Sequence, residues 1–155
     1  IAAEYALVGD EDPVFKGGSY AFIQKYSHDM SKWRALTVEE QERVIGRKKF
    51  NDVELGDDEK PNTAHNNVSK AYDELDKELK NMRANMPFSN PSKNEYGTFF
   101  IGYARKFSVT RQMLAHMFQG DADGNLDRLL DFSTATTGTL FFVPTINFLE
   151  SLGDD

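Results

Sequence analysis

The stretch "GTFFIGYAR", Gly97–Arg105, decides the fold class of this 155-residue chain. Its bulky and apolar side chains fall on both sets of alternate positions: Phe99, Ile101 and Tyr103 on one side, and Phe100, Gly102 and Ala104 on the other. Successive side chains of a strand point to opposite faces of its sheet, and a run that is apolar on both faces is typical of a strand buried on both sides. We therefore expect a core strand at these residues.

Further elements are predicted on either side of this strand. Ser19–His28 is rich in aromatic and aliphatic residues and predicts a strand, while "GTLFFVP" (Gly138–Pro144) predicts another buried strand, which its proline ends. Thr145–Leu152 predicts a short closing helix. Tyr72–Met82 has the composition of a helix, but propensity alone leaves this segment ambiguous.

Two longer helices carry start signals. Thr37 followed by Glu40 is a capping-box pattern, and Gly46 follows the last turn of that helix. Ser108 is expected to cap a second helix, which ends near Gly120. The apolar stripe of this second helix comprises Val109, Met113, Leu114, Met117 and Phe118. Strands and helices thus alternate without a repeat or a linker, which predicts one domain over residues 1–155, an α+β sandwich of antiparallel sheet and helices.

The bulk composition excludes several classes of function. The formal charge of −7 argues against nucleic-acid binding, which needs a concentrated basic face. No apolar run could span a membrane and no secretory signal is present, so we expect a cytoplasmic protein. The absence of cysteine excludes thiol catalysis, iron–sulfur clusters and cysteine zinc sites. "DADGNLD" (Asp121–Asp127) resembles a calcium loop, but its glycine is misplaced and Phe132 stands where a glutamate is needed, so we predict a turn.

Histidine and arginine remain as candidates for chemistry. His28, at the end of a strand, and His116, on a helix flank, are each expected to be a surface residue or a partly satisfied structural residue. His65 alone cannot form a zinc or copper site, so it would be a solvated loop residue unless a haem supplies the other ligands of a metal. A peroxidase also needs a charged donor to stabilise negative charge as the O–O bond of a peroxide breaks, which suits arginine. Arg83 and Arg105 are both candidates, and either could instead be a salt-bridged surface residue.

Five blocks of sequence occur in an order that matches one family. They are "KPNTAH" (60–65), "RANMPF" (83–88), "GTFFIGYAR" (97–105), "LLDFSTATTGTLFFVP" (129–144) and "FLESL" (148–152). With these blocks the whole chain resembles the C-terminal half of a bacterial dye-decolourising peroxidase of the B type. The resemblance implies a ferredoxin-like α+β fold, in which the ambiguous segment after His65 is a β-hairpin with Arg83 on its returning strand.

The same resemblance implies the site residues. His65 matches the axial ligand of haem b (iron protoporphyrin IX), Arg83 matches the distal arginine in preference to the other candidate, and Asn85 matches a polar distal neighbour. Asp131 resembles the carboxylate that orients the axial histidine, which would raise the basicity of the imidazole. Phe100 is implied as a residue that lines the haem pocket.

The implied function is haem peroxidase chemistry, in which hydrogen peroxide is used to oxidise dyes, phenolic aromatics and other small aromatic reductants, or Mn(II), by one-electron steps. The resemblance also implies a homo-oligomer and, as for some members, packing inside an encapsulin shell. The resemblance places the family's G-x-x-D-G motif, whose aspartate assists proton transfer, upstream of Ile1, so we expect a longer protein. The alternatives are a haem-binding or porphyrin-handling protein without efficient peroxidase turnover, and an interaction module without a cofactor.

Overall fold

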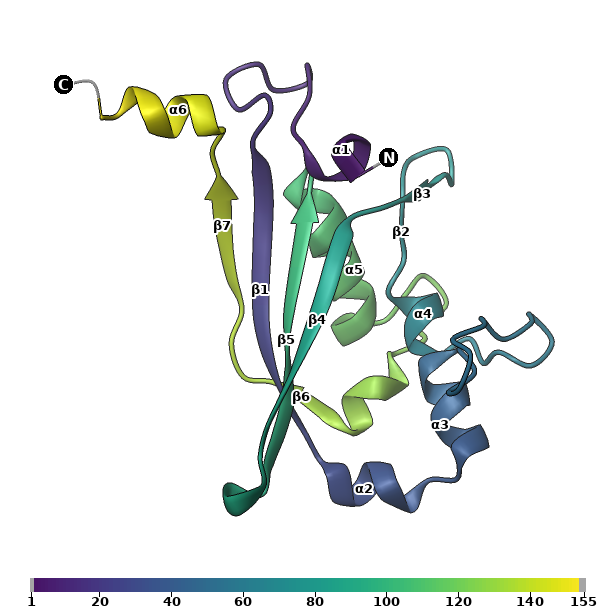
Figure 1. Cartoon of the computed structure of the whole chain (residues 1–155). Coiled ribbons are helices and arrows are strands. Elements are labelled where there is room, and N and C mark those ends of the chain that lie inside the picture. Colours follow the sequence, from purple (N-terminus) through teal and green to yellow (C-terminus); the bar gives the residue numbers. More distant parts are fainter. Residues whose placement is uncertain (1, 154–155) are drawn as a thin grey trace.

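The computed structural model describes residues 2–153, and it shows an antiparallel sheet with helices gathered on one side (Figure 1). The strands are β1 (Ser19–His28), β2 (Ala71–Tyr72), β3 (Glu78–Leu79), β4 (Met82–Asn90), β5 (Glu95–Ala104), β6 (Ser133–Ala135) and β7 (Thr139–Val143). The α-helices are α1 (Ala2–Ala6), α2 (Met30–Ala35), α3 (Val38–Ile45), α4 (His65–Val68), α5 (Phe107–Gln119) and α6 (Ile146–Ser151). Two short 3₁₀ helices are η1 (Pro91–Lys93) and η2 (Arg128–Asp131). The predicted α+β class is confirmed.

The main sheet runs in the order β4, β5, β1, with β6 and β7 following one another along the remaining edge of β1. Residues in register on neighbouring strands share a face of the sheet. Two such rows are Asn85, Phe100 and Gln24, and then Pro87, Thr98 and Tyr26. These rows belong to the inner face, which we define as the face toward α4 and α5 (Figure 1).

The two apolar strands are present, but they are not buried as predicted. The strand predicted at Gly97–Arg105 forms β5, with Ala104 fully buried on the inner face and Phe99 39% exposed on the outer face. The strand predicted at Gly138–Pro144 forms β7, and all of its residues are exposed. Exposed apolar side chains of the outer face are Met82, Met86, Phe99, Phe141 and Val143. The prediction of burial is wrong because, within residues 2–153, α4 and α5 lie on the inner-face side and no helix covers the outer face (Figure 1).

Helix α3 begins and ends as its sequence predicts. Thr37 and Glu40 form the capping box, with each side chain accepting a hydrogen bond from the backbone N–H of the other. Gly46 follows the helix with φ of 88°, a left-handed conformation that favours glycine. A Cβ atom at this position would lie 1.8 Å from Oδ1 of Asn66, so the glycine also lets α4 approach the end of α3.

Helix α5 departs from its prediction at the start. Its N-cap is Lys106, without a side-chain hydrogen bond, so the predicted cap at Ser108 is wrong and Ser108 lies inside the first turn. The apolar stripe is confirmed at the buried residues Val109, Met113 and Met117. Phe118 is 44% exposed because it points about a quarter turn away from Met117 on the helix surface.

The ambiguous segment after His65 folds as a hairpin, as the family resemblance implied. Strands β2 and β3 pair in antiparallel fashion. The carboxylate of Asp73 accepts hydrogen bonds from the backbone N–H groups of Leu75 and Lys77, which fixes the turn between the strands and overrides helical propensity. Arg83 lies on the next strand, β4, rather than on the returning strand of this hairpin.

Among the helices within residues 2–153, none combines the length and the hydropathy that crossing a bilayer requires.

Candidate cofactor site

A cavity of about 540 Å³ separates the inner face of the sheet from the helices. The sheet contributes Gln24, Tyr26, Arg83, Asn85, Thr98 and Phe100 to its lining, and the helices contribute His65, Ser69, Met113, Met117 and Leu130. The volume is typical of a ligand or cofactor pocket. Four of the predicted site residues, namely His65, Arg83, Asn85 and Phe100, thus line one cavity.

His65 is held by a buried carboxylate. It is the first residue of α4, and its Nδ1 lies 2.6 Å from Oδ2 of Asp127, whose side chain is fully buried. Because a carboxylate only accepts hydrogen bonds, Nδ1 carries a proton, and in the tautomer with its proton on Nδ1 the lone pair is on Nε2. No hydrogen bond from residues 2–153 reaches Nε2. His65 is therefore prepared to bind a metal through Nε2.

Asp127 is itself fixed from several sides. Its second oxygen, Oδ1, accepts a hydrogen bond of 2.9 Å from the backbone N–H of Leu129, which makes Asp127 the N-cap of η2. Its own N–H donates to the carbonyl of Met117 at 3.3 Å, and the next N–H, of Arg128, donates to the carbonyl of Thr63 at 3.1 Å. The carboxylate is thereby placed between the end of α5 and the segment that leads into α4.

The prediction that Asp131 orients His65 is wrong, because the carboxylate beside His65 is that of Asp127. Asp131 ends η2, its side chain is 68% exposed, and its nearest ionic partner is Arg128 at 3.9 Å. The N-cap at the start of η2 faces α4, whereas the last residue of η2 faces solvent. The sequence did contain a signal for Asp127, because an aspartate directly before the helical turn "RLLD" is a common N-cap pattern.

The turn that contains Asp127 is confirmed. Oδ1 of Asp121 accepts hydrogen bonds from the backbone N–H groups of Asp123 and Asn125, at 3.0 and 2.9 Å. These bonds lower the pKa of Asp121, against the opposing effect of desolvation, which is the largest single contribution. The interpretation of this segment as a turn assigned no role to its last residue, Asp127.

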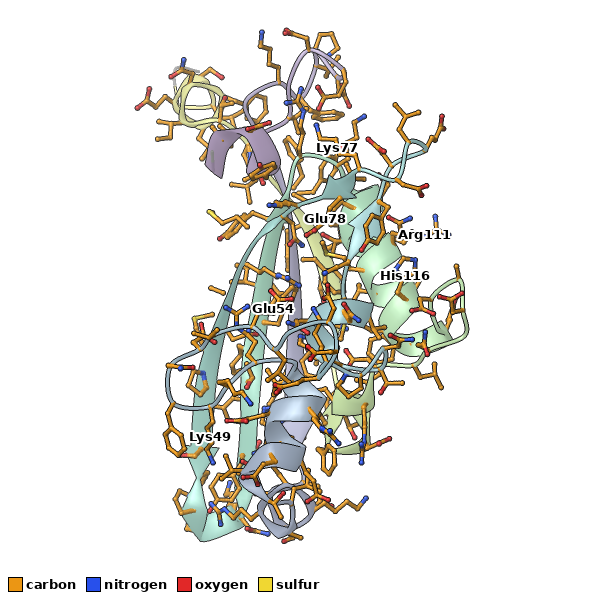
Figure 2. The ribbon with its side chains drawn as sticks, turned by 90° about the vertical axis from the view of Figure 1, so that its right-hand side faces the viewer. Lys49, Glu54, Lys77, Glu78, Arg111 and His116 are labelled. Atoms are coloured by element: carbon orange, nitrogen blue, oxygen red, sulfur yellow. The ribbon has the colours of Figure 1, made fainter. Side chains whose placement is uncertain are left out.

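Arg83 faces His65 from the opposite wall. It is exposed, and it lines the cavity from β4 together with Asn85. Desolvation disfavours the charged form of Arg83 and lowers its pKa. The negative charge of Glu78, labelled in Figure 2, opposes this shift and raises the pKa. The guanidinium stays charged, since arginine does not lose its proton in proteins. Within residues 2–153 no carboxylate forms an ion pair with Arg83, which leaves its donors available to a ligand.

The other candidate arginine, Arg105, is already paired. Its Nε donates to Oε1 of Glu11 at 2.5 Å and its Nη2 bonds to Oε2, and it is not part of the cavity lining. The hydrogen bond from the guanidinium holds the pKa of Glu11 at about 2. Arg105 therefore links the first loop to the end of β5 and is not a site residue.

The field of Asp127 also reaches the sheet. Tyr26 lies on the inner face of β1, and its hydroxyl donates to Oε1 of Gln24 at 2.7 Å. Burial, and to a smaller extent the negative charge of Asp127, raise the pKa of Tyr26 to about 12. The phenol is therefore neutral at any ordinary pH.

Three buried polar atoms of the cavity wall have no hydrogen-bond partner within residues 2–153. They are Oγ of Ser69, Oδ1 of Asn66 and Oδ1 of Asn81. Buried polar groups are normally paired, so a wall with several orphans is typical of a site that a bound group completes. Residues 2–153 contain no cluster of three or more potential metal-ligating side chains. A porphyrin brings four nitrogens of its own, so one available imidazole nitrogen and a cavity whose surface is mostly apolar fit the haem b that the resemblance implied.

Comparison with known proteins agrees with this geometry. The family model described as "Dyp-type peroxidase, C-terminal" matches residues 1–148. The chain belongs to the Dyp-type peroxidase family. This membership confirms the resemblance stated above, and the structural matches confirm the predicted ferredoxin-like arrangement of sheet and helices.

Three Dyp-type peroxidases illustrate the similarity. The curated dye-decolorizing peroxidase of Mycolicibacterium paratuberculosis is 56% identical over 150 residues, which are 97% of this chain and 42% of that protein. The crystal structure of a dye-decolorizing peroxidase from Bacteroides thetaiotaomicron is 61% identical with a TM-score of 0.93, covering 99% of this chain and 48% of that one. DyPB from Rhodococcus jostii RHA1 is 56% identical with a TM-score of 0.93, covering 99% and 49%. This chain thus spans about half the length of the peroxidases that it matches.

Proposed function

We propose that this chain is the haem-binding module of a dye-decolourising peroxidase, with residues 1–155 forming the C-terminal part of a longer protein. The observation that carries the proposal is the His65–Asp127 pair on one wall of a cavity whose other wall presents Arg83. A variant of DyPB from Rhodococcus jostii RHA1, 56% identical to this chain, is described as a complex with heme, which supports haem b as the cofactor here.

His65 would hold the haem iron through Nε2, and Asp127 sets the orientation and the tautomer of its ring. The buried carboxylate keeps the ring in the tautomer with a lone pair on Nε2, and its negative charge makes that nitrogen more basic. When bound, haem supplies the redox chemistry with peroxide, while the protein sets the axial ligand and the polarity of the cavity.

Arg83 acts on the opposite side of the cavity. Its guanidinium provides several charged donors to hydrogen peroxide and stabilises the negative charge that develops as the O–O bond breaks. Asn85, two residues further along β4, adds a neutral polar group to the same wall. Phe100 pairs with Asn85 in the sheet and contributes an aromatic surface beside them.

The substrates are hydrogen peroxide and small aromatic reductants such as dyes and phenols, or Mn(II). A DyPB variant is described as a complex with manganese, which supports the metal as a reductant. The peroxidase of Mycobacterium smegmatis, 56% identical over 96% of this chain, is described as encapsulated. By this similarity we propose a cytoplasmic homo-oligomer that is packed inside an encapsulin shell.

The axial assignment is tested with the longer protein that contains this chain. Replacing His65 with alanine should abolish the sharp, shifted Soret band of protein-bound haem and leave the spectrum of free hemin, because it removes the single protein ligand of the iron. His116→Gln is the matched control, since His116 lies on α5 outside the cavity lining and bonds to the carbonyl of Lys70 (Figure 2). Normal hemin uptake and peroxide turnover by the His65 variant would refute the proposal.

A further inference from the structure

His28 is a partly buried titratable group that the proposed function does not use. It is the last residue of β1, and both nitrogens of its ring are bonded to hydroxyl groups. Nδ1 lies 2.8 Å from Oγ of Ser133 on β6, and Nε2 lies 2.7 Å from Oγ1 of Thr98 on β5. The three side chains form a continuous hydrogen-bonded chain that crosses the sheet from one strand to another.

The hydrogen-bonded row of Thr98, His28 and Ser133 lies between two separate pockets. His28, Thr98 and Ser133 all line the cavity that contains His65. His28 and Thr98 also line a second, open hollow of about 390 Å³, beside Met30 and Tyr96. Ser133 belongs to the first cavity only and is 6% exposed. The hydroxyl of Thr98 and the ring of His28 therefore stand in the wall between an open hollow and the candidate haem cavity.

We propose that Thr98, His28 and Ser133 conduct protons from the open hollow into the cavity, an inference that rests on the proposed peroxidase function. A hydroxyl group can accept one proton and release another, and so can an imidazole ring with a neighbour at each nitrogen. A proton that arrives from Thr98 at Nε2 of His28 is matched by release of a proton from Nδ1 to Ser133. Because both nitrogens already have hydroxyl partners, the ring is placed for transfer and not for binding iron.

The protonation state of His28 agrees with this role. Burial lowers the pKa of His28 below its ordinary value, so the ring is neutral at neutral pH and is able to accept a proton. A surface imidazole would instead stay partly charged close to neutral pH.

The peroxidase reaction needs a proton path from solvent when the electron donor brings no protons of its own. Reduction of one hydrogen peroxide to two waters consumes two electrons and two protons. A phenolic donor loses one proton with each electron, so a donor that binds at the cavity brings its own protons. Ferrocyanide gives an electron and no proton, so each proton must then enter from solvent. The contribution of Thr98, His28 and Ser133 to turnover should therefore be large with ferrocyanide and small with a phenol.

The experiment uses the full-length, haem-loaded protein with saturating hydrogen peroxide. His28→Gln keeps a donor and an acceptor for the two hydroxyl groups but cannot pass a proton across a ring. We expect turnover with ferrocyanide to fall about 100-fold, the lower end of the range for a removed proton-transfer group. Turnover with 2,6-dimethoxyphenol should change less than about twofold, because that donor carries its own protons. Thr98→Val, which removes the hydroxyl at nearly constant size, should reproduce the pattern, and His116→Gln should not.

A second measurement does not depend on turnover. NMR of the histidine ring protons should show exchange of the His28 N–H with solvent, and Thr98→Val should slow this exchange because it removes the group at the open hollow. Equal losses with both donors would mean that His28 is only structural and would overturn the proposal, as would unchanged ferrocyanide turnover in His28→Gln. Failure of the haem assignment would appear separately, as normal hemin binding by the His65 variant.

Discussion

Replacing Asp127 with asparagine removes the buried negative charge that faces Nδ1 of His65 and keeps the size of the side chain. The asparagine oxygen can still accept the hydrogen bond from the backbone N–H of Leu129, which leaves the amide NH₂ directed at the imidazole. An NH₂ group only donates, so the ring must present a lone pair at Nδ1 and carry its proton on Nε2. In that tautomer Nε2 has no lone pair with which to bind iron.

The magnitude follows from the bond that is lost. A hydrogen bond to a charged group contributes about 1.5 to 3 kcal/mol. That loss corresponds to roughly 10- to 150-fold in affinity, which overlaps the losses of about 10- to 100-fold found when the partner of a metal-ligating histidine is removed. We expect hemin affinity of the Asp127→Asn protein to fall within this interval, and the reduction potential of the bound iron to rise because the axial nitrogen is less basic.

The assay is a titration of hemin into the haem-free, full-length protein, followed by the Soret band, with a potentiometric titration of the loaded protein. Asp131→Asn is the matched control, because it makes the same chemical change at an exposed carboxylate four positions away. If Asp127→Asn binds hemin within about twofold of the unmodified protein, or if Asp131→Asn is the weaker of the two, the role derived for Asp127 is refuted.

Two further predictions concern the two arginines. Arg83→Leu should retain hemin binding and lose about 100-fold or more of its rate of reaction with hydrogen peroxide, as expected for removal of a charge-stabilising donor; stopped-flow spectroscopy measures this rate, and loss of hemin binding instead would assign Arg83 a structural role. Glu11→Gln should lower thermal stability near neutral pH, because the pKa of Glu11 is depressed to about 2 by its hydrogen bond with Arg105. A carboxyl group whose pKa is depressed in the folded protein stabilises the fold at pH values above its ordinary pKa of about 4.3, and this stabilisation is lost as the pH falls toward the folded pKa. The difference in Tm between the two proteins should therefore shrink to nothing near pH 2. A difference that persists there would contradict the ion-pair explanation.

Local features of this fold were predictable, whereas features that depend on distant partners were not. The capping box of Thr37 and Glu40 involves four consecutive residues, and the sequence predicted it correctly. The burial of β7 was predicted from its apolar composition. That composition indicates that covering the strand would be favourable, but it does not indicate whether residues 2–153 supply an element that covers it. Residue chemistry left Arg83 and Arg105 both open, and only the family resemblance chose between them. The role of Asp127 was not predicted, because it depends on where η2 packs, and no local sequence pattern determines that.

The histidine and the carboxylate that polarises it stand 62 positions apart in the chain, with β4, β5 and all of α5 between them. During synthesis, His65 emerges well before Asp127, and their contact closes a long stretch of chain, which costs conformational entropy that packing of the intervening elements offsets. An imidazole that has not yet met this aspartate is not held in its metal-binding tautomer. Under the proposed function, tight haem binding then depends on a contact between distant parts of the chain, so that incorporation of haem reports that the His65 and Asp127 segments have packed together.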